Sequence, residues 1–186
     1  MQLTSSVRAI GFIGLIGVFS CGESDGTGPG NGEPPEASFD YELTGDIQLS
    51  VTGDSLDIEV GEAFGSGILW QLHLQGGSNN ENGGISFVYR GEKPAEGSYT
   101  VRAVSMPADL SGLAQDEFAA FAELDPGVEA TRFLGFETSG EITIARADAL
   151  GYEGTFDFDA DGAMFAPGES AQDATVNFSG SFQVPR

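Results

Sequence analysis

The stretch "ATVNFSGSFQV" (residues 174–184) near the C-terminus decides the fold class. Every second residue in this stretch is apolar or glycine, and most of the residues between them are polar. A strand with this period of two buries one face and leaves the other in water, which is typical of antiparallel sheet. The buried face is predicted to consist of Val176, Phe178, Gly180, Phe182 and Val184.

The same alternation recurs along the chain from Phe39 onward, and turn-forming clusters separate the alternating stretches. These clusters are "TGDS", "GGSNNENGG", "GEKPAEG" and "TSGE". The first is interpreted as a β-hairpin with Gly53 in its turn. We therefore predict an all-β fold, an antiparallel sandwich or barrel of about eight to nine strands with one inserted helix.

The inserted helix is predicted within "MPADLSGLAQDEFAAFAELDPG" (residues 106–127). Pro107 suits a helix start, and the sequence Asp-Pro-Gly at residues 125–127 suits a stop. We expect this helix to cover an open end or an edge of the sheet, and a lid over a binding cavity is the alternative. Its apolar residues at helical spacing are Leu110, Leu113, Ala114, Phe118, Phe121 and Leu124.

The charge of the chain narrows the classes of partner. It has 186 residues, with 7 basic and 29 acidic side chains and a formal net charge of -22. This balance argues against nucleic acid, because phosphate binding needs clustered Lys or Arg. It leaves cations as natural small partners, although an acidic surface also simply keeps an exported protein in solution.

The counts of cysteine and histidine exclude two further classes of site. A single cysteine allows no disulfide within the chain. A single histidine, His73, rules out a histidine-rich metal site within one chain.

Residues 1–20 are predicted to be an export signal. Arg8 supplies a positive charge, and "AIGFIGLIGVF" (residues 9–19) supplies an apolar segment. That segment is shorter than the about 20 residues that a membrane-spanning helix needs.

The end of this segment, "VFSC", resembles the lipobox of bacterial lipoproteins. Val18 is the aliphatic residue three positions before Cys21, and Ser20 is the small residue just before it, whereas Phe19 is less usual at its position. The resemblance implies cleavage between Ser20 and Cys21 and lipidation of the Cys21 thiol, whose thiolate is the nucleophile. The alternative is an ordinary secretory signal with a chance cysteine.

Location follows from the same resemblance. Gly22 stands after the cysteine in place of the aspartate that retains lipoproteins at the inner membrane. The resemblance therefore implies a lipid-anchored protein of the bacterial cell envelope, held at the outer membrane and facing the periplasm or the cell surface.

Residues 21–37 carry the lipidated cysteine and a flexible acidic tether rich in Gly and Pro, and residues 38–186 form a single β domain. Within that domain, "KPAEGSYTV" and the closing pattern "SGEITI…EGTFDFDA…ATVNFSGSFQV" are similar to small all-β lipoproteins of bacterial envelopes. This similarity implies a fold and a location, and it assigns no functional residue.

The motif "GDSL" (residues 53–56) resembles the nucleophile block of an esterase and lipase family, with Ser55 as the nucleophile. That family supplies its base from an Asp-x-x-His block, and His73, the only histidine, has no aspartate three residues before it. We therefore predict no catalytic residue, and a hydrolase using Ser55 remains an alternative.

The motif "DFDADG" (residues 157–162) resembles a calcium-binding loop, in which Asp157, Asp159 and Asp161 would hold the ion. The twelfth position of such a loop, where a bidentate glutamate belongs, is Gly168 here. The alternative is a strand with the three aspartates on its outer face. Calcium is the one cofactor that the sequence suggests.

Taken together, these observations predict a non-enzymatic binding or interaction module anchored to a membrane by lipid. Its partner is expected to be a small hydrophobic or glycan ligand in the sheet interior, or another envelope protein, and not nucleic acid. A structural or assembly factor of the envelope is the alternative from another class.

Overall fold

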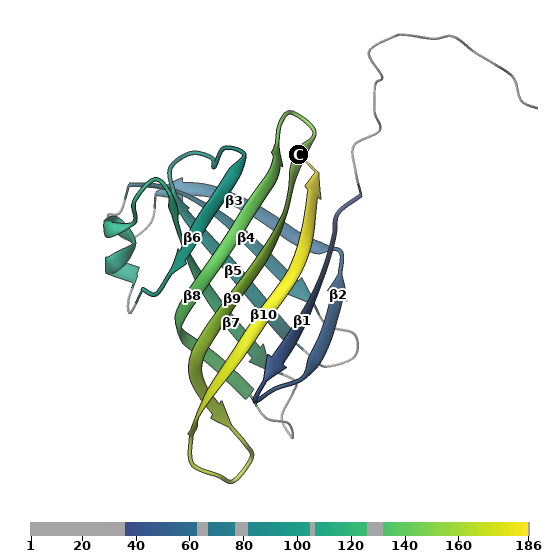
Figure 1. The fold of residues 1–186 in the computed structure, drawn as a ribbon, viewed down its shortest axis with the longest axis vertical. Helices are drawn as coiled ribbons and strands as arrows, with labels where there is room; N and C mark the ends of the chain where they lie inside the picture. Colours follow the sequence, from purple (N-terminus) through teal and green to yellow (C-terminus); the bar gives the residue numbers. More distant parts are fainter. Residues whose placement is uncertain (1–35, 63–66, 77–81, 105–106, 126–131, 186) are drawn as a thin grey trace, which may run out of the picture. The chain divides into compact units, whose positions relative to one another are not determined.

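The structure is a computed structural model that describes residues 36–62, 67–76, 82–104, 107–125 and 132–185. Within these residues the chain forms ten strands and one short 3-10 helix (Figure 1). The all-β prediction is confirmed, but the structure has more strands than the eight to nine predicted. The strands are β1 (Ser38–Gly45), β2 (Leu49–Gly53), β3 (Ser55–Glu62), β4 (Ile68–Gly76), β5 (Asn82–Arg90), β6 (Gly97–Arg102), β7 (Glu117–Asp125), β8 (Arg132–Ala147), β9 (Gly151–Phe165) and β10 (Gln172–Pro185).

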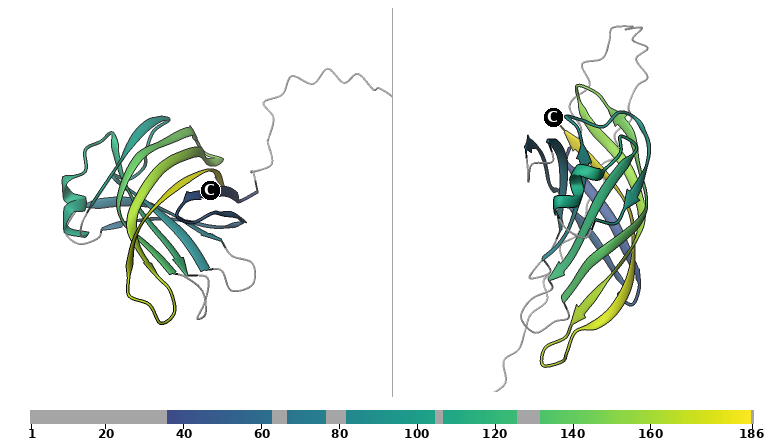
Figure 2. Two further views of the ribbon diagram at one scale, coloured as in Figure 1. Left: turned by 60° about the horizontal axis from the view of Figure 1, so that its bottom comes forward. Right: turned by 90° about the vertical axis from the view of Figure 1, so that its left-hand side faces the viewer.

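All ten strands belong to one sheet with the order β2-β1-β10-β9-β8-β6-β7-β5-β4-β3, and β7 also pairs with β8. Every pairing is antiparallel except the short parallel one between β6 and β7. The sheet curls into a closed barrel core, as the strands curving around a common interior in Figure 2 show. The structure thus decides between the two predicted architectures in favour of a barrel.

The segment "TGDS" is a corner and not the predicted hairpin turn. Strand β2 pairs with β1 and strand β3 pairs with β4, so the two strands stand at opposite ends of the sheet order. The chain passes from one to the other through Asp54 alone. A sequence pattern of strand, turn and strand is the same whether the second strand pairs with the first or with a different strand. The pattern alone therefore did not exclude a hairpin, and the prediction was wrong.

A second predicted turn, "TSGE", lies inside β8. Strand β8 runs without a break over sixteen residues and pairs with β9 along most of its length. The register shifts between Gly135 and Glu137 and again between Ile144 and Arg146, which marks two bulges. The sequence therefore predicted two short strands where the structure has one long, bent strand.

The interior of the barrel is filled with aromatic side chains. Phe158 and Phe178 stack with their ring centroids 5.2 Å apart and their planes 6° from parallel. Phe87 packs against Phe158 edge to face. Val176, Phe178, Phe182 and Val184 are all buried in this core, as the alternation in residues 174–184 predicts.

The predicted helix over residues 106–127 is wrong. The structure has only the 3-10 helix η1 (Pro107–Gly112) there, followed by strand β7. Strand β7 buries Phe118 and Ala120 in the barrel interior and Ala119 in a separate apolar cluster on the outside. A strand that is apolar on both faces loses its period of two, and its sequence then fits a helical spacing equally well.

We call this second cluster the outer cluster. It lies on the outer face of β4, β5 and β7, because its members alternate with the interior residues of the same strands. The η1 segment covers this face and not a cavity. The outer cluster consists of Leu69, Val88, Val104, Leu110, Leu113 and Ala119.

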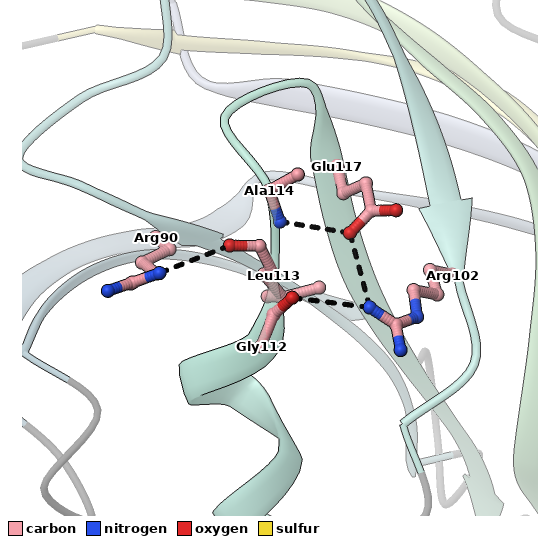
Figure 3. Close-up of polar contacts among 6 residues, drawn as sticks. All are labelled: Arg90, Arg102, Gly112, Leu113, Ala114 and Glu117. Carbon is pink, nitrogen blue, oxygen red and sulfur yellow. Dashed lines mark hydrogen bonds and ion pairs between the residues drawn. The ribbon is translucent and has the colours of Figure 1, made fainter.

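Two arginines fasten the end of the η1 segment to the sheet (Figure 3). The Arg90 guanidinium donates a hydrogen bond to the Leu113 carbonyl at 3.5 Å. The Arg102 guanidinium lies 3.3 Å from the Gly112 carbonyl and 3.4 Å from the Glu117 carboxylate. That carboxylate also accepts a hydrogen bond from the Ala114 amide at 2.9 Å. These contacts hold a short irregular segment over the outer cluster without an α-helix.

One buried hydroxyl in the core, that of Tyr41, is expected to make the free energy of unfolding decrease at alkaline pH. Burial raises the pKa of Tyr41 from 10.0 to about 12, and its hydroxyl has no hydrogen-bond partner. The folded protein therefore keeps this proton above pH 10, where the unfolded chain releases it. We expect the free energy of unfolding contributed by Tyr41 to be intact below pH 10 and to fall by about 1.4 kcal/mol per pH unit up to pH 12.

Denaturant unfolding of the wild type and of Tyr41→Phe across this pH range measures the effect. The variant should lose less stability at alkaline pH and should be at least as stable at neutral pH, because it removes an unpaired buried hydroxyl. Parallel pH profiles for the two proteins would contradict the prediction.

Candidate functional site

A hollow of about 830 Å³ lies where the inner face of β3 meets the start of β9 and the end of β10, and we call it the β3 pocket. Its apolar lining comes from β3, β4, β9 and β10, and its charged lining includes side chains from the loop after β5. The apolar lining residues are Leu56, Ile58, Val60, Ile68, Trp70, Tyr152, Val184 and Pro185.

The pocket exists because β3 is only partly covered. Leu56, Ile58 and Val60 carry the alternation of an inward face, but the first two are half-buried and Val60 is 55% exposed. Ile68 on β4 is 40% exposed. Val60 and Ile68 are two of the four exposed large hydrophobic residues in the part of the chain that the structure describes, and both line this pocket.

Trp70, the only tryptophan of the chain, forms part of the pocket wall. It is 1% exposed, and its ring packs against Tyr152 at 5.2 Å and edge to face against Phe118 at 6.1 Å. Its indole N–H is buried and has no hydrogen-bond partner. Buried donors are nearly always paired in folded proteins, so this one calls for an explanation.

The rim of the β3 pocket is acidic. Asp57, Glu62 and Glu92 line it together with Lys93, which is the only lysine of the chain. All four are exposed. The pocket therefore combines an apolar wall with a rim of three carboxylates and one ammonium group.

A second hollow, of about 800 Å³, lies over the outer face of β4, β5 and β7 and contains the residues of the hydrolase alternative. Ser55 and His73 both line it, but the histidine is bonded to another serine, with His73 Nδ1 2.8 Å from Ser86 Oγ. Ser86 lies opposite His73 on β5, and Asp57 lies opposite His73 on β3, the other neighbour of β4.

This row of Asp57, His73 and Ser86 does not form a catalytic triad. A triad joins the carboxylate to Nδ1 and the serine to Nε2, whereas here Nδ1 faces the serine. Among the described residues no hydrogen bond joins Asp57 to His73. The arrangement gives no support to Ser55 or Ser86 as a nucleophile.

The predicted calcium loop is not a loop. Asp157, Asp159 and Asp161 lie within β9, on its outer face, in extended backbone. The Asn177 amide donates to Asp157 at 2.9 Å and to Asp159 at 3.1 Å, and the Thr175 hydroxyl donates to Asp161 at 2.5 Å. Within the described ranges no group of three or more acidic, histidine or cysteine side chains is placed to hold a metal ion. The alternative interpretation, a strand with outward aspartates, matches the structure.

Asp161 also borders an acidic hollow of about 400 Å³ with Asp46, Glu137 and Asp173. Neither Asp157 nor Asp159 lines this hollow, so it is not the predicted site.

The residues of the predicted anchor, Val18, Phe19, Ser20 and Cys21, lie outside the described residues. Among the described residues, no helix has the length and apolarity to cross a membrane.

Sequence reasoning did not find the β3 pocket. The alternation of β3 gives Leu56, Ile58 and Val60 an inward orientation, and Trp70 is buried. Nothing in the pattern distinguishes an inward residue that is covered from one that is not, since the covering wall comes from strands about 90 to 130 residues later in the chain.

Comparison of the chain with models of known protein families finds no match. Curated proteins and solved structures likewise contain none that matches it. The proposal for its function therefore rests on the residues themselves.

Proposed function

We propose that this protein is a lipid-anchored binding module of the bacterial cell envelope, and that the β3 pocket binds an apolar ligand. The observation that carries the proposal is the apolar lining of this pocket, in which the side chains of Val60 and Ile68 are exposed. Apolar concave surfaces with a few polar groups are the usual form of small-ligand sites.

The ligand is proposed to lie in this pocket rather than at the centre of the barrel. The centre is filled by stacked aromatic rings, such as Phe158 and Phe178. An occupant there would have to displace packed core residues, whereas the β3 pocket is open in the structure as it stands.

The position of Glu36, where the described chain begins, supports a ligand that comes from the membrane. The Glu36 carbonyl accepts a hydrogen bond from the Gln183 amide at 3.3 Å, and the neighbouring residues Val184 and Pro185 line the pocket. The chain leading to Cys21 therefore starts beside the pocket. Its fifteen residues can span at most about 50 Å, which would keep the pocket within reach of a bilayer that holds a lipidated Cys21.

The binding part of the proposal is tested with Nile red, a neutral apolar dye, on the purified domain. Val60→Asp should weaken dye binding at least about tenfold, because the apolar dye would have to cover and desolvate the new carboxylate. Leu150→Asp is the matched control, since Leu150 is likewise an exposed large hydrophobic residue, at 40%, but does not line the pocket. Equal dye binding by the two variants and the wild type would contradict the proposal.

The anchoring part of the same test uses the full chain expressed in a bacterium. The wild type should partition with membranes and incorporate labelled fatty acid, and Cys21→Ser should lose both properties. Incorporation of the label into Cys21→Ser would refute the anchor, and dye binding by the purified domain does not depend on this result.

A further inference from the structure

We infer that β3 is a docking edge, beside which a second protein adds an extended segment with alternating basic and apolar side chains. This inference goes beyond the proposed function, because the partner is a protein and the backbone of β3 holds it. Three observations on β3 carry the inference, and they concern its outer edge, its partly exposed apolar row and its carboxylates.

The outer edge of β3 is the first observation. Strand β3 stands at one end of the sheet order and, among the described strands, pairs only with β4. Alternate residues of an antiparallel strand point their N–H and C=O groups to opposite sides, so about half of these groups in β3 face away from β4. Six of its eight residues are exposed. A strand added here would pair with these backbone groups.

Strand β3 lacks the features that usually keep other strands away from an edge. Such features are proline, lysine, a bulge or a very short strand. Strand β3 has eight residues without proline or lysine, and its register with β4 is unbroken from Ser55 to Glu62. The strand at the other end of the sheet order, β2, has five residues. Of the two ends, β3 is therefore the better template for an added strand.

The inward row of β3, formed by Leu56, Ile58 and Val60, is the second observation. The first two side chains are half-buried, and Val60 is 55% exposed. An added strand places every second side chain on the same face as this row, where apolar side chains would remove it from water. The β3 pocket offers the space, because the row lines it together with Val184 and Pro185 of β10. The segment is therefore expected to be apolar at every second position.

The carboxylates of β3 are the third observation. Asp57 and Glu59 alternate with the inward row, and both are exposed. The neighbouring pocket adds Glu62 and Glu92 against the single Lys93. Opposite charges that face each other across two strands stabilise the pair, and like charges destabilise it. The positions between the apolar residues of the segment are therefore expected to carry lysine or arginine, which the net charge of -22 would also attract from a distance.

A second copy of this chain fits the edge less well than a basic segment does. Two copies of β3 that pair antiparallel, with their apolar rows on one face, bring like charges together. With Ile58 opposite Ile58, Asp57 of one copy faces Glu59 of the other. A shift of two residues in either direction places Glu59 opposite Glu59 or Asp57 opposite Asp57. The partner is therefore a different protein.

The test measures, by fluorescence anisotropy at low salt, how a capped eight-residue peptide of alternating lysine and valine binds to the purified protein. We expect it to bind at least about tenfold more tightly than the same peptide with glutamate in place of lysine. It should also bind at least about fivefold more tightly than a peptide of four lysines followed by four valines. Equal binding of the two basic peptides would show attraction by charge only and would overturn the inference.

Methylation of backbone nitrogens in the same peptide tests the pairing with β3. In an extended peptide all valine N–H groups point to one side and all lysine N–H groups point to the other. Methylation of one of these two sets should weaken binding at least about tenfold, and methylation of the other set should leave the hydrogen bonds to β3 intact. Losses of equal size for the two methylated peptides would contradict one-sided pairing with an edge.

The carboxylates are tested with the double variant Asp57→Asn, Glu59→Gln. It should bind the alternating peptide at least about threefold more weakly than the wild type at low salt, with a smaller difference at high salt. The matched control is Asp40→Asn, Glu42→Gln, which changes the same residue types at the same spacing on β1, a strand that is paired on both sides. Equal losses for the two double variants would refute a local role of β3.

Further outcomes separate the possible occupants and the two proposals. If the protein alone sediments as a dimer that the alternating peptide dissociates, a second copy occupies the edge and the inference is wrong. If Nile red binds and Val60→Asp weakens its binding, but the peptide does not bind, the proposed function stands and this inference fails. If the peptide binds and Nile red does not, the docking edge stands and the proposed binding of an apolar ligand fails.

Discussion

Replacing Gly180 with valine should destabilise the domain by about 3 kcal/mol or more. Gly180 lies in the middle of β10, directly opposite Tyr41 on β1 and Phe156 on β9. A Cβ atom at Gly180 would lie 2.7 Å from the Cα of Tyr41, and closer still to the Cβ of Tyr41 and the carbonyl oxygen of Asp40. Relief of these contacts requires the backbone of β1 to move away from β10.

The reason for a glycine at this inward position is the space that its neighbours need. The rings of Tyr41 and Phe156 lie 6.2 Å apart across the strand that carries Gly180. A side chain between them would displace one ring from the core. Glycines in strands often mark such a close approach of neighbouring groups.

Chemical denaturation of Gly180→Val measures this effect, and Gly61→Val is its matched control. Gly61 also lies in a strand, but no atom comes within 4 Å of the Cβ that a side chain would add there. The control should change the free energy of unfolding by less than about 1 kcal/mol, because valine suits a strand. Losses of similar size for the two variants would contradict the argument from close approach.

The substitution Phe178→Ala should destabilise the domain by about 3 to 5 kcal/mol. Phe178 is fully buried and stacks on Phe158 at 5.2 Å, and its ring lies 6.2 Å from Phe133 and 6.3 Å from Tyr41. Truncation would leave a cavity among rings that come from three other strands, and a packed aromatic core cannot collapse to fill it without loss of other contacts.

The matched control for this variant is Phe165→Ala, at the end of β9. Phe165 is 38% exposed, so its truncation should cost within about 1 kcal/mol. Thermal and denaturant unfolding of both variants measure the difference. A cost for Phe178→Ala no larger than that for Phe165→Ala would refute the central role of the stacked pair.

A packed interior also has a consequence for function. Because the centre of the barrel is occupied by its own side chains, the ligand binding that we propose would have to take place at its periphery. The β3 pocket supplies such a peripheral site, since its apolar wall is continuous with the core but remains partly exposed. A substitution in the core should therefore mainly change the free energy of unfolding, and a substitution in the pocket should mainly change the affinity for a ligand.

The strands with one buried face were predictable from the sequence. In residues 152–161 of β9 and 174–184 of β10, inward apolar residues or glycines alternate with outward polar residues, because one face meets the aromatic core and the other meets water. The interpretation of Asp157, Asp159 and Asp161 as an outward-facing row follows from the same alternation. Where only one face of a strand is buried, the alternation in the sequence is enough to predict which side chains face the core.

Strand β7 could not be predicted in this way. Ala119 and Phe121 face the outer cluster, and Phe118 and Ala120 face the interior, so the segment has no polar face to reveal its period. The outer cluster is itself completed by the η1 segment, which Arg90 and Arg102 fasten in place. A local pattern cannot show a second apolar environment that is assembled from distant segments.

The sequence by itself determined that the chain is all-β, that residues 174–184 bury every second side chain, and that no disulfide or histidine-rich metal site can form within one chain. These properties depend on composition and on the period of side chains along a strand. Only the tertiary structure decided that Asp54 is a corner, that the sheet closes into a barrel, and that Val60, Ile68 and Trp70 share a pocket. Closure of the barrel and exposure of a side chain depend on which strand, distant in the sequence, lies opposite that residue. The local alternation of side chains does not specify this pairing.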